Sequence, residues 1–274
     1  MTTITEEQYG KFDEQGYILV EGILDDDLLR RAIDAADRAE AETQDDWNKW
    51  KDDPDRFKSY GNGPTAHVIE PILQHDDVFL DILEHPVATR FAREMQGPDM
   101  MMIDNAYHVK VAGTRAHTKW HRDAPRWAHE VENFTPEDGA AWDATRRCDT
   151  PHFKIKIFYL LDDVDEETGP FSVVPGTHRV EDPPPPVDTL DAMPNLARMT
   201  GPAGSAVIWN GRIWHTALDN TDTKARRMLL YNYTHFGMKQ YDWCIAKDDY
   251  RDRLARERSA WCQQLLGIER APLN

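Results

Sequence analysis

The tetrapeptide Trp120-His121-Arg122-Asp123 and the distant His215 constrain the fold of this chain more than any other feature. Residues two apart on an extended segment point to the same side, so His121 and Asp123 can reach one metal ion. The chain must then fold back to bring His215 to the same point. Two imidazoles and one carboxylate on one face of a metal leave coordination positions open, as in non-haem Fe(II) sites.

A pair of arginines, Arg226 and Arg227, follows His215 by about the length of a strand. A planar guanidinium can bind a carboxylate through two parallel hydrogen bonds. Such a residue would hold the far carboxylate of a 2-oxo dicarboxylic acid whose other end chelates the metal. Neighbouring residues on a strand face opposite sides, so only one arginine can serve, and the spacing favours Arg226.

Composition excludes several classes of protein. The chain has 274 residues, 32 of them basic and 49 acidic, for a net charge of -17. This charge argues against a nucleic-acid or anionic-membrane partner. Its cysteines, Cys148, Cys244 and Cys262, show no Cys-x-x-Cys spacing, so we expect neither a disulfide framework nor a thiolate zinc site. With no signal-peptide pattern and no apolar run of about 20 residues, we expect a cytoplasmic protein.

The hydrophobic pattern predicts helices first and strands afterwards. We expect one domain with a helical part over about 1–97, a jelly-roll core over about 98–240 and a C-terminal helix over about 247–266. The predicted helices are 5–16, 25–42, 76–83, 86–95 and 248–266, and the main predicted strands are 17–20, 106–111, 153–161, 171–174, 204–209 and 225–234. This order indicates a mainly β fold, a jelly-roll barrel with helices packed outside it.

Two polar stretches, 43–64 and 124–150, interrupt this pattern. The first reads as a loop or broken helix. The second is a long irregular loop, and loops of that length inside a compact domain are usually functional. It contains Trp127 and Trp142, which we take as candidate substrate-pocket residues, although simple packing would explain each of them equally well.

The His-x-Asp segment, the distal His215 and Arg226, with further motifs along the chain, resemble those of the phytanoyl-CoA dioxygenase family of Fe(II)/2-oxoglutarate oxygenases. The segment Phe12-Asp13-Glu14-Gln15-Gly16-Tyr17 is similar to the usual beginning of that family. The later motifs follow in order: Lys110, Trp120 to Asp123, Gly169 to Arg179, His215 and Arg226. Together these motifs cover about residues 9–235.

The resemblance implies a double-stranded β-helix and the oxidation of an unactivated C–H bond. It implies His121, Asp123 and His215 as metal ligands and catalytic residues, and Arg226 as the residue that binds 2-oxoglutarate. The implied cofactors are Fe(II), 2-oxoglutarate and O₂, with ascorbate supporting activity. Asp123 favours hydroxylation or a related oxidation, because related halogenases lack this carboxylate.

Members of this family also place a polar side chain on the strand before the His-x-Asp motif, near the co-substrate. Asp104 or Asn105 falls there, and we favour Asn105 because a second carboxylate would repel the ligand. The alternating Lys154 and Lys156 are most simply the exposed face of a strand. If that face turns inward, they would instead meet an anionic substrate.

Two other functions remain open. A cupin-like hydrolase or isomerase could hold Zn²⁺ or Mn²⁺ on the same His, Asp and His residues. A catalytically silent barrel that only binds a ligand is disfavoured, because all four key residues are present. The expected partner is a small-molecule substrate, and the closing helix is a candidate surface for a homodimer.

Overall fold

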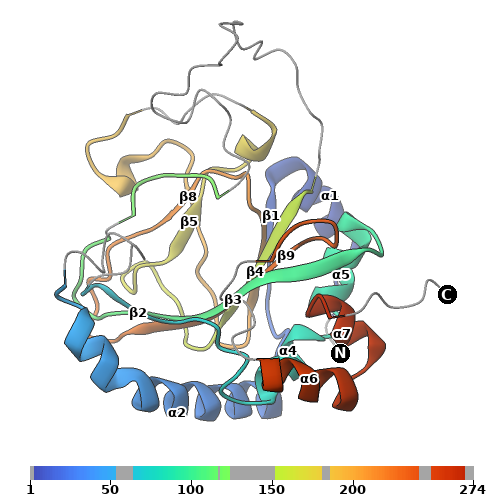
Figure 1. Ribbon diagram of the computed structural model, residues 1–274. Coiled ribbons are helices and arrows are strands. Elements are labelled where there is room, and N and C mark those ends of the chain that lie inside the picture. Colours follow the sequence, from blue (N-terminus) through green and yellow to red (C-terminus); the bar gives the residue numbers. More distant parts are fainter. Residues whose placement is uncertain are drawn as a thin grey trace, which may run out of the picture.

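The fold is mainly β, with two antiparallel sheets and a layer of helices (Figure 1). This computed structural model describes residues 3–53, 64–116, 118–123, 152–180, 186–240 and 248–268. Over these residues it confirms the predicted mainly β fold with packed helices. Trp127 and Trp142 lie outside the described residues.

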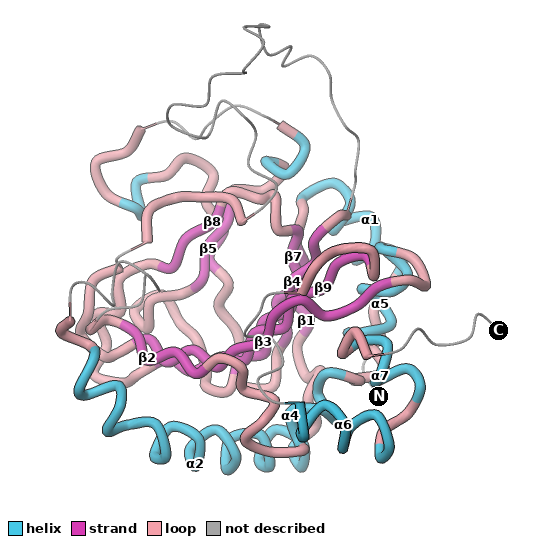
Figure 2. The backbone as a smooth tube through the Cα atoms, viewed as in Figure 1, coloured by secondary structure: helices cyan, strands magenta, loops and turns pink. Residues whose placement is uncertain are grey.

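Helices predominate up to Gln96 and strands from Met100 to His235, as the hydrophobic pattern predicts, and Figure 2 shows them in cyan and magenta. The helices are α1 (Glu6–Gln15), α2 (Asp26–Trp50), α4 (Val78–Leu83), α5 (Ala88–Gln96), α6 (Asp248–Glu257) and α7 (Ala260–Leu265), with short 3-10 turns η2 (Thr177–Arg179) and η3 (Leu190–Ala192). The strands are β1 (Tyr17–Val20), β2 (Ala66–Ile69), β3 (Met100–Lys110), β4 (Lys154–Leu160), β5 (Phe171–Val173), β6 (Ala197–Arg198), β7 (Ala206–Asn210), β8 (His215–Ala217) and β9 (Arg226–His235).

The larger sheet has six strands in the order β1-β7-β4-β9-β3-β2, and the smaller has three in the order β6-β5-β8. The pairing of β3 with β9 is the longest, running from Met100 opposite His235 to Lys110 opposite Arg226. Its register shifts between Met102 and Asp104, which is a β-bulge. Because strands that are neighbours in the sheet are far apart in the sequence, residues from distant parts of the chain lie on the same face.

Both faces of the larger sheet are buried. Its outer face packs against the helices, where Tyr231 and Tyr107 join residues such as Phe79 of α4 and Ala36 of α2. In Figure 1, α2 runs beneath this sheet. The inner face forms a second apolar cluster with the smaller sheet, containing side chains such as those of Phe158 and Phe171. The space between the two sheets therefore has apolar walls.

Local signals explain where several elements start and stop. The Thr5 hydroxyl accepts a hydrogen bond from the backbone N–H of Gln8, and the Gln8 side chain caps Thr5 in return, as the capping box predicts. Helix α1 ends at Gly16, whose φ of +83° few residues other than glycine adopt.

Two sequence predictions need correction. Helix α2 continues to Trp50, so the first part of the expected loop at 43–64 is helical. The closing helix is two helices, because the Ser259 hydroxyl caps a new start at α7. The turn at Asn210-Gly211 leads from β7 to β8, which belong to different sheets. It carries the chain from the larger sheet to His215 in the smaller one.

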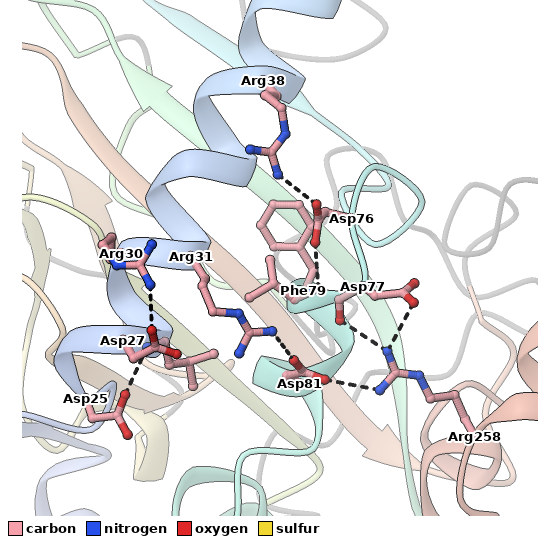
Figure 3. A network of polar contacts seen from close by, with 12 residues as sticks. Asp25, Asp27, Arg30, Arg31, Arg38, Asp76, Asp77, Phe79, Asp81 and Arg258 are labelled. Carbon is pink, nitrogen blue, oxygen red and sulfur yellow. Dashed lines mark hydrogen bonds and ion pairs between the residues drawn. The ribbon is translucent and has the colours of Figure 1, made fainter.

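Ion pairs fasten the helical layer together (Figure 3). Arg31 of α2 pairs with Asp81 of α4 at 2.6 Å, and Arg258, between α6 and α7, reaches the same carboxylate at 3.1 Å. These contacts hold the C-terminal helices against α4. None of the helices in the described part of the chain has the length and apolar character of a bilayer span.

Candidate metal centre

His121 and His215 face each other across an isolated β-bridge. The backbone N–H of His121 donates to the His215 carbonyl at 3.1 Å, and the reverse bond measures 3.0 Å. The backbone N–H of Asp123 donates to Gly211 at 3.0 Å. Arg122, between His121 and Asp123 in the sequence, points the other way. It donates to the Thr177 carbonyl at 2.9 Å and stacks on the ring of Trp214. The His-x-Asp segment is thereby held in extended form.

The three predicted ligands converge. One ligand atom from each of His121, Asp123 and His215 lies within 4.8 Å of the others. Asp123 Oδ1 is 3.6 Å from Nε2 of each histidine. Two imidazoles and a carboxylate at such separations form a donor set that suits a divalent transition metal.

The other ring nitrogen of each histidine fixes its tautomer. Nδ1 of His121 lies 2.8 Å from the Lys119 carbonyl, and Nδ1 of His215 lies 2.9 Å from the Ile213 carbonyl. A carbonyl only accepts, so Nδ1 must carry the proton in both rings. Each Nε2 then presents a lone pair to the centre, which is the arrangement of metal-binding histidines. Burial lowers the pKa of His215 to about 3 and keeps this ring neutral.

The second oxygen of Asp123 accepts a hydrogen bond from Lys156 Nζ. Burial would raise the pKa of Asp123, but the positive charge of Lys156 and of other neighbours outweighs it and lowers this pKa. Asp123 is therefore ionised and oriented, with Oδ1 directed at the two histidines and Oδ2 held by the lysine.

Arg226 and Arg227 lie on opposite faces of β9, as the alternation predicts. Arg226 starts the strand opposite Lys110 and is only 4% exposed, and its Nε and Nη1 have no hydrogen-bond partner. Burial lowers the pKa of Arg226 to about 10, which leaves it charged at neutral pH. Arg227 instead binds Asp162 and Asp37 on the outer side.

A cavity of about 230 Å³ connects these groups. Its charged and polar lining is His108, Lys110, Thr118, His121, Asp123, Lys156, His215, Thr216 and Arg226. Apolar side chains make up most of the remaining wall: Ala66, Ala116, Phe158, Phe171, Trp209, Ala217, Met228 and Leu230. The triad and Arg226 thus share one pocket with largely apolar walls.

The expectation for Asn105 is wrong. Asn105 is fully buried on the outer face, where its side-chain oxygen accepts from the backbone N–H of Leu73 at 3.1 Å. Asp104 occupies the inner face instead. Charge repulsion alone does not choose between Asp104 and Asn105, because the face of the strand that turns inward decides which side chain meets the pocket.

Lys154 and Lys156 are also not the exposed face of a strand. They are 4% and 8% exposed and lie on the inner face of β4. The contact between Lys156 and Asp123 was not anticipated. A signal was present, because a strand that alternates lysine with isoleucine and then continues as Phe-Tyr-Leu is too apolar to have one face in water.

Comparisons with known proteins agree with this geometry. Residues 12–228 match the family model described as phytanoyl-CoA dioxygenase. The L-proline trans-4-hydroxylase of Streptomyces griseoviridis is 27% identical over 185 residues, which cover 58% of this chain and 63% of that protein. The aligned part therefore spans less than two thirds of that relative. The dioxygenase cdmD of Talaromyces verruculosus is 21% identical over 93% of this chain and 80% of its own length.

Among solved structures, HygX from Streptomyces hygroscopicus, with nickel and 2-oxoglutarate bound, superposes with a TM-score of 0.65. It is 14% identical, and the superposition covers 87% of this chain and 90% of HygX. This likeness supports the jelly-roll fold. The family match spans most of the chain and includes the His-x-Asp segment and the distal histidine. The chain therefore belongs to the phytanoyl-CoA dioxygenase family.

Proposed function

We propose that this protein is an Fe(II)- and 2-oxoglutarate-dependent dioxygenase that oxidises a C–H bond of a small molecule. The observation that carries the proposal is that one pocket contains both the triad and the buried Arg226, whose Nε and Nη1 have no hydrogen-bond partner. The family membership and the metal and 2-oxoglutarate in HygX support it.

The triad fits ferrous iron. His121 and His215 would bind through Nε2 and Asp123 through Oδ1, because these atoms point at one another. Three protein ligands would leave coordination positions for a chelating co-substrate and O₂. Bound iron would supply the oxidising chemistry, in which 2-oxoglutarate becomes succinate and CO₂ as the substrate is oxidised.

Arg226 fits the far carboxylate of 2-oxoglutarate. Removing a guanidinium from water without a partner is costly, and two of its nitrogens have none. A bound carboxylate would provide both hydrogen bonds and the opposite charge. Lys110, opposite Arg226, adds a second positive group, although its ammonium also donates to the Arg115 carbonyl at 2.7 Å.

By the family resemblance, the position two residues after the distal histidine often carries a serine or threonine that touches the co-substrate, and here it is Ala217. The neighbouring Thr216 hydroxyl is already engaged, since it donates to the Thr118 carbonyl at 2.6 Å. Arg226 is therefore the principal anchor in this proposal. The apolar wall near the triad, including Phe158 and Leu230, limits the access of water to the oxidising centre.

The test is reconstitution of the protein with Fe(II) under anaerobic conditions, followed by titration with 2-oxoglutarate. We expect saturable, iron-dependent binding and, after O₂ and a substrate are added, formation of succinate. A non-redox hydrolase or isomerase would work with Zn²⁺ or Mn²⁺ and would need no 2-oxoglutarate. Binding that is independent of the metal, or turnover without 2-oxoglutarate, would rule out the proposed function.

A further inference from the structure

A row of polar residues crosses the inner face of the larger sheet beside the triad. Asp104 of β3 lies opposite Asn232 of β9, and Asn232 lies opposite Lys156 of β4. Lys156 in turn lies opposite Trp209 of β7. Residues directly opposite each other on adjacent strands hold their side chains side by side. Four strands thus place these side chains in one line.

The row faces the same side as the pocket. Asn232 alternates with Leu230 and Met228, both of which line the cavity. Asp104 alternates in the same way with His108. Lys156, next in the row, belongs to the cavity lining itself and holds Asp123. The row therefore continues the pocket directly beyond the metal ligands.

Polar atoms in this row have no partner although they are buried. Asp104 is 7% exposed and its Oδ1 accepts no hydrogen bond. Asn232 is 1% exposed, and both its amide nitrogen and its amide oxygen are unpartnered. Trp209 is fully buried and its Nε1 has no acceptor. Each such atom costs stability, so their concentration in one row indicates a ligand that would satisfy them.

This row is separate from the co-substrate anchor. Asn232 stands six residues after Arg226 on β9, a span of about 20 Å along an extended strand. Met228 and Leu230 lie between them on the same face and are apolar. A molecule that reaches from the triad to Arg226 would therefore leave the row free. Through Lys156, which contacts Asp123, the row is adjacent to the triad and can hold a second molecule.

The charges and the unpartnered atoms of the protein at this end of the pocket restrict the chemistry of that second molecule. Two aspartates and two lysines, Asp104, Asp123, Lys154 and Lys156, lie at this end of the inner face and balance in charge. A ligand with a large net charge would disturb this balance. The unpartnered atoms comprise two acceptors and two donors, so the ligand must both donate and accept hydrogen bonds.

We propose that the primary substrate is a small zwitterion of the amino-acid class, held by this row. Its ammonium group would donate to Asp104 Oδ1 and to the side-chain oxygen of Asn232. Its carboxylate would accept from the Asn232 amide and from the ammonium of Lys156, which has three N–H donors and uses one on Asp123. The inference rests on the proposed function, because it concerns the substrate of the same centre.

The experiment is anaerobic calorimetry on the iron-loaded protein in two stages. The first titrates 2-oxoglutarate and tests the proposed function alone. The second keeps 2-oxoglutarate saturating and titrates the protein amino acids and their small N-methylated and cyclic analogues. For the amino acid that binds best, its amide keeps only the positive charge and its N-acetyl derivative keeps only the negative one. We expect both derivatives to bind at least about tenfold more weakly.

Variants then test the residues. We expect Asp104→Asn and Asn232→Leu to weaken binding of the amino acid by about 10- to 100-fold. Affinity for 2-oxoglutarate should stay within about twofold, which also shows that the variants fold. Asp37→Asn removes a carboxylate from the outer side of the molecule and serves as the matched control. It should change neither affinity.

The outcomes separate the two proposals. If 2-oxoglutarate binds but no amino acid does, or if a derivative binds as well as its parent, the substrate class is wrong and the dioxygenase proposal stands. Unchanged amino-acid affinity in Asp104→Asn would also overturn the assignment of the row. If 2-oxoglutarate itself fails to bind, both proposals fall.

Discussion

The two faces of β9 place arginine side chains in opposite environments. Arg226, on the inner face, is almost fully buried and leaves two of its nitrogens without a partner. Arg227, one residue later on the outer face, donates to Asp162 through both Nε and Nη2 and to Asp37 through Nη1. The outer arginine is saturated by protein groups, whereas the inner one is not.

The same contrast extends to other residues of these strands. On the outer face, the hydroxyl of Tyr231 donates to the Phe79 carbonyl at 2.7 Å, and the hydroxyl of Tyr107 donates to Glu40 at 3.1 Å. On the inner face, Asp104 and Asn232 keep unpartnered atoms. Protein interiors normally pair their polar groups, so we expect Arg227 to contribute to stability and Arg226 to bind a ligand. The division is sharpest for these charged side chains, since the Tyr159 hydroxyl on the outer face is also unpartnered. Four predictions test this division, and the largest expected effect comes first.

Replacing Asp123 by alanine should abolish iron-dependent turnover of 2-oxoglutarate. The variant loses a metal ligand, and even the loss of an outer hydrogen-bond partner of a ligand typically costs about 10- to 100-fold in affinity. Iron content after anaerobic reconstitution and succinate formation are the measurements. Asp123→Asn, which keeps the size of the side chain, separates loss of the ligand from loss of packing. Normal turnover in either variant would remove Asp123 from the metal centre.

Replacing Arg226 by methionine should weaken the binding of 2-oxoglutarate by at least about 100-fold, since two charge-assisted hydrogen bonds of about 1.5–3 kcal/mol each are lost. Iron binding should persist. The free energy of unfolding of the metal-free protein should not fall, because Nε and Nη1 of Arg226 make no hydrogen bond that the methionine would lose. Calorimetry and urea unfolding measure the two effects. A clear loss of stability with unchanged affinity would place Arg226 among the structural residues.

Replacing Arg227 by methionine should lower the stability of the protein and leave the binding of 2-oxoglutarate unchanged. The Asp162 carboxylate, 25% exposed, would lose its guanidinium partner. We expect the free energy of unfolding to fall by about 1–3 kcal/mol. Affinity for 2-oxoglutarate should be unchanged, because Arg227 does not reach the cavity. Arg226→Met and Arg227→Met together form a matched pair, and similar behaviour of the two variants would contradict the division between the faces.

Acid should destabilise the protein through buried histidines outside the site. Burial lowers the pKa of His67 and of His178 to about 4. The unfolded chain takes up these protons near pH 6.5 and the folded chain does not, so stability is lost as pH falls from about 6.5 towards 4. We expect His67→Gln to reduce the slope of unfolding free energy against pH by about 1.4 kcal/mol per unit around pH 5. An unchanged slope would show that His67 is not buried as a neutral ring.

Much of the architecture follows from local signals in the sequence. The capping box at Thr5, the left-handed Gly16 and the period-two pattern of β4 and β9 placed these elements close to their observed bounds. The end of α2 was missed because most residues from Thr43 to Trp50 have low helix propensity. Contacts with distant parts of the chain are made by this turn, such as the bond from Trp47 Nε1 to the Ala66 carbonyl at 3.1 Å. The break before α7 depends on one serine cap, which a continuous helical pattern conceals.

The donor set of the site could be inferred from spacing, since an extended His-x-Asp pair must point to one side. Alternation alone also told us that Arg226 and Arg227 would separate. The partners of these residues could not be inferred in the same way. That Lys156 meets Asp123, and that Asp104 stands beside Asn232, depends on the register among β3, β9 and β4.

Residue types and their spacing were thus sufficient to name the candidate metal ligands, the arginine proposed to hold the co-substrate and the mainly β fold. They could not say whether Asp104 or Asn105 turns inward, nor which way the lysines of β4 point. Alternation along a strand divides its residues between two faces but does not show which face turns toward the pocket. Burial does not show it either, because both faces of this sheet are buried. The helices that pack on one face, the smaller sheet opposite the other and the bulge after Met102 make that choice.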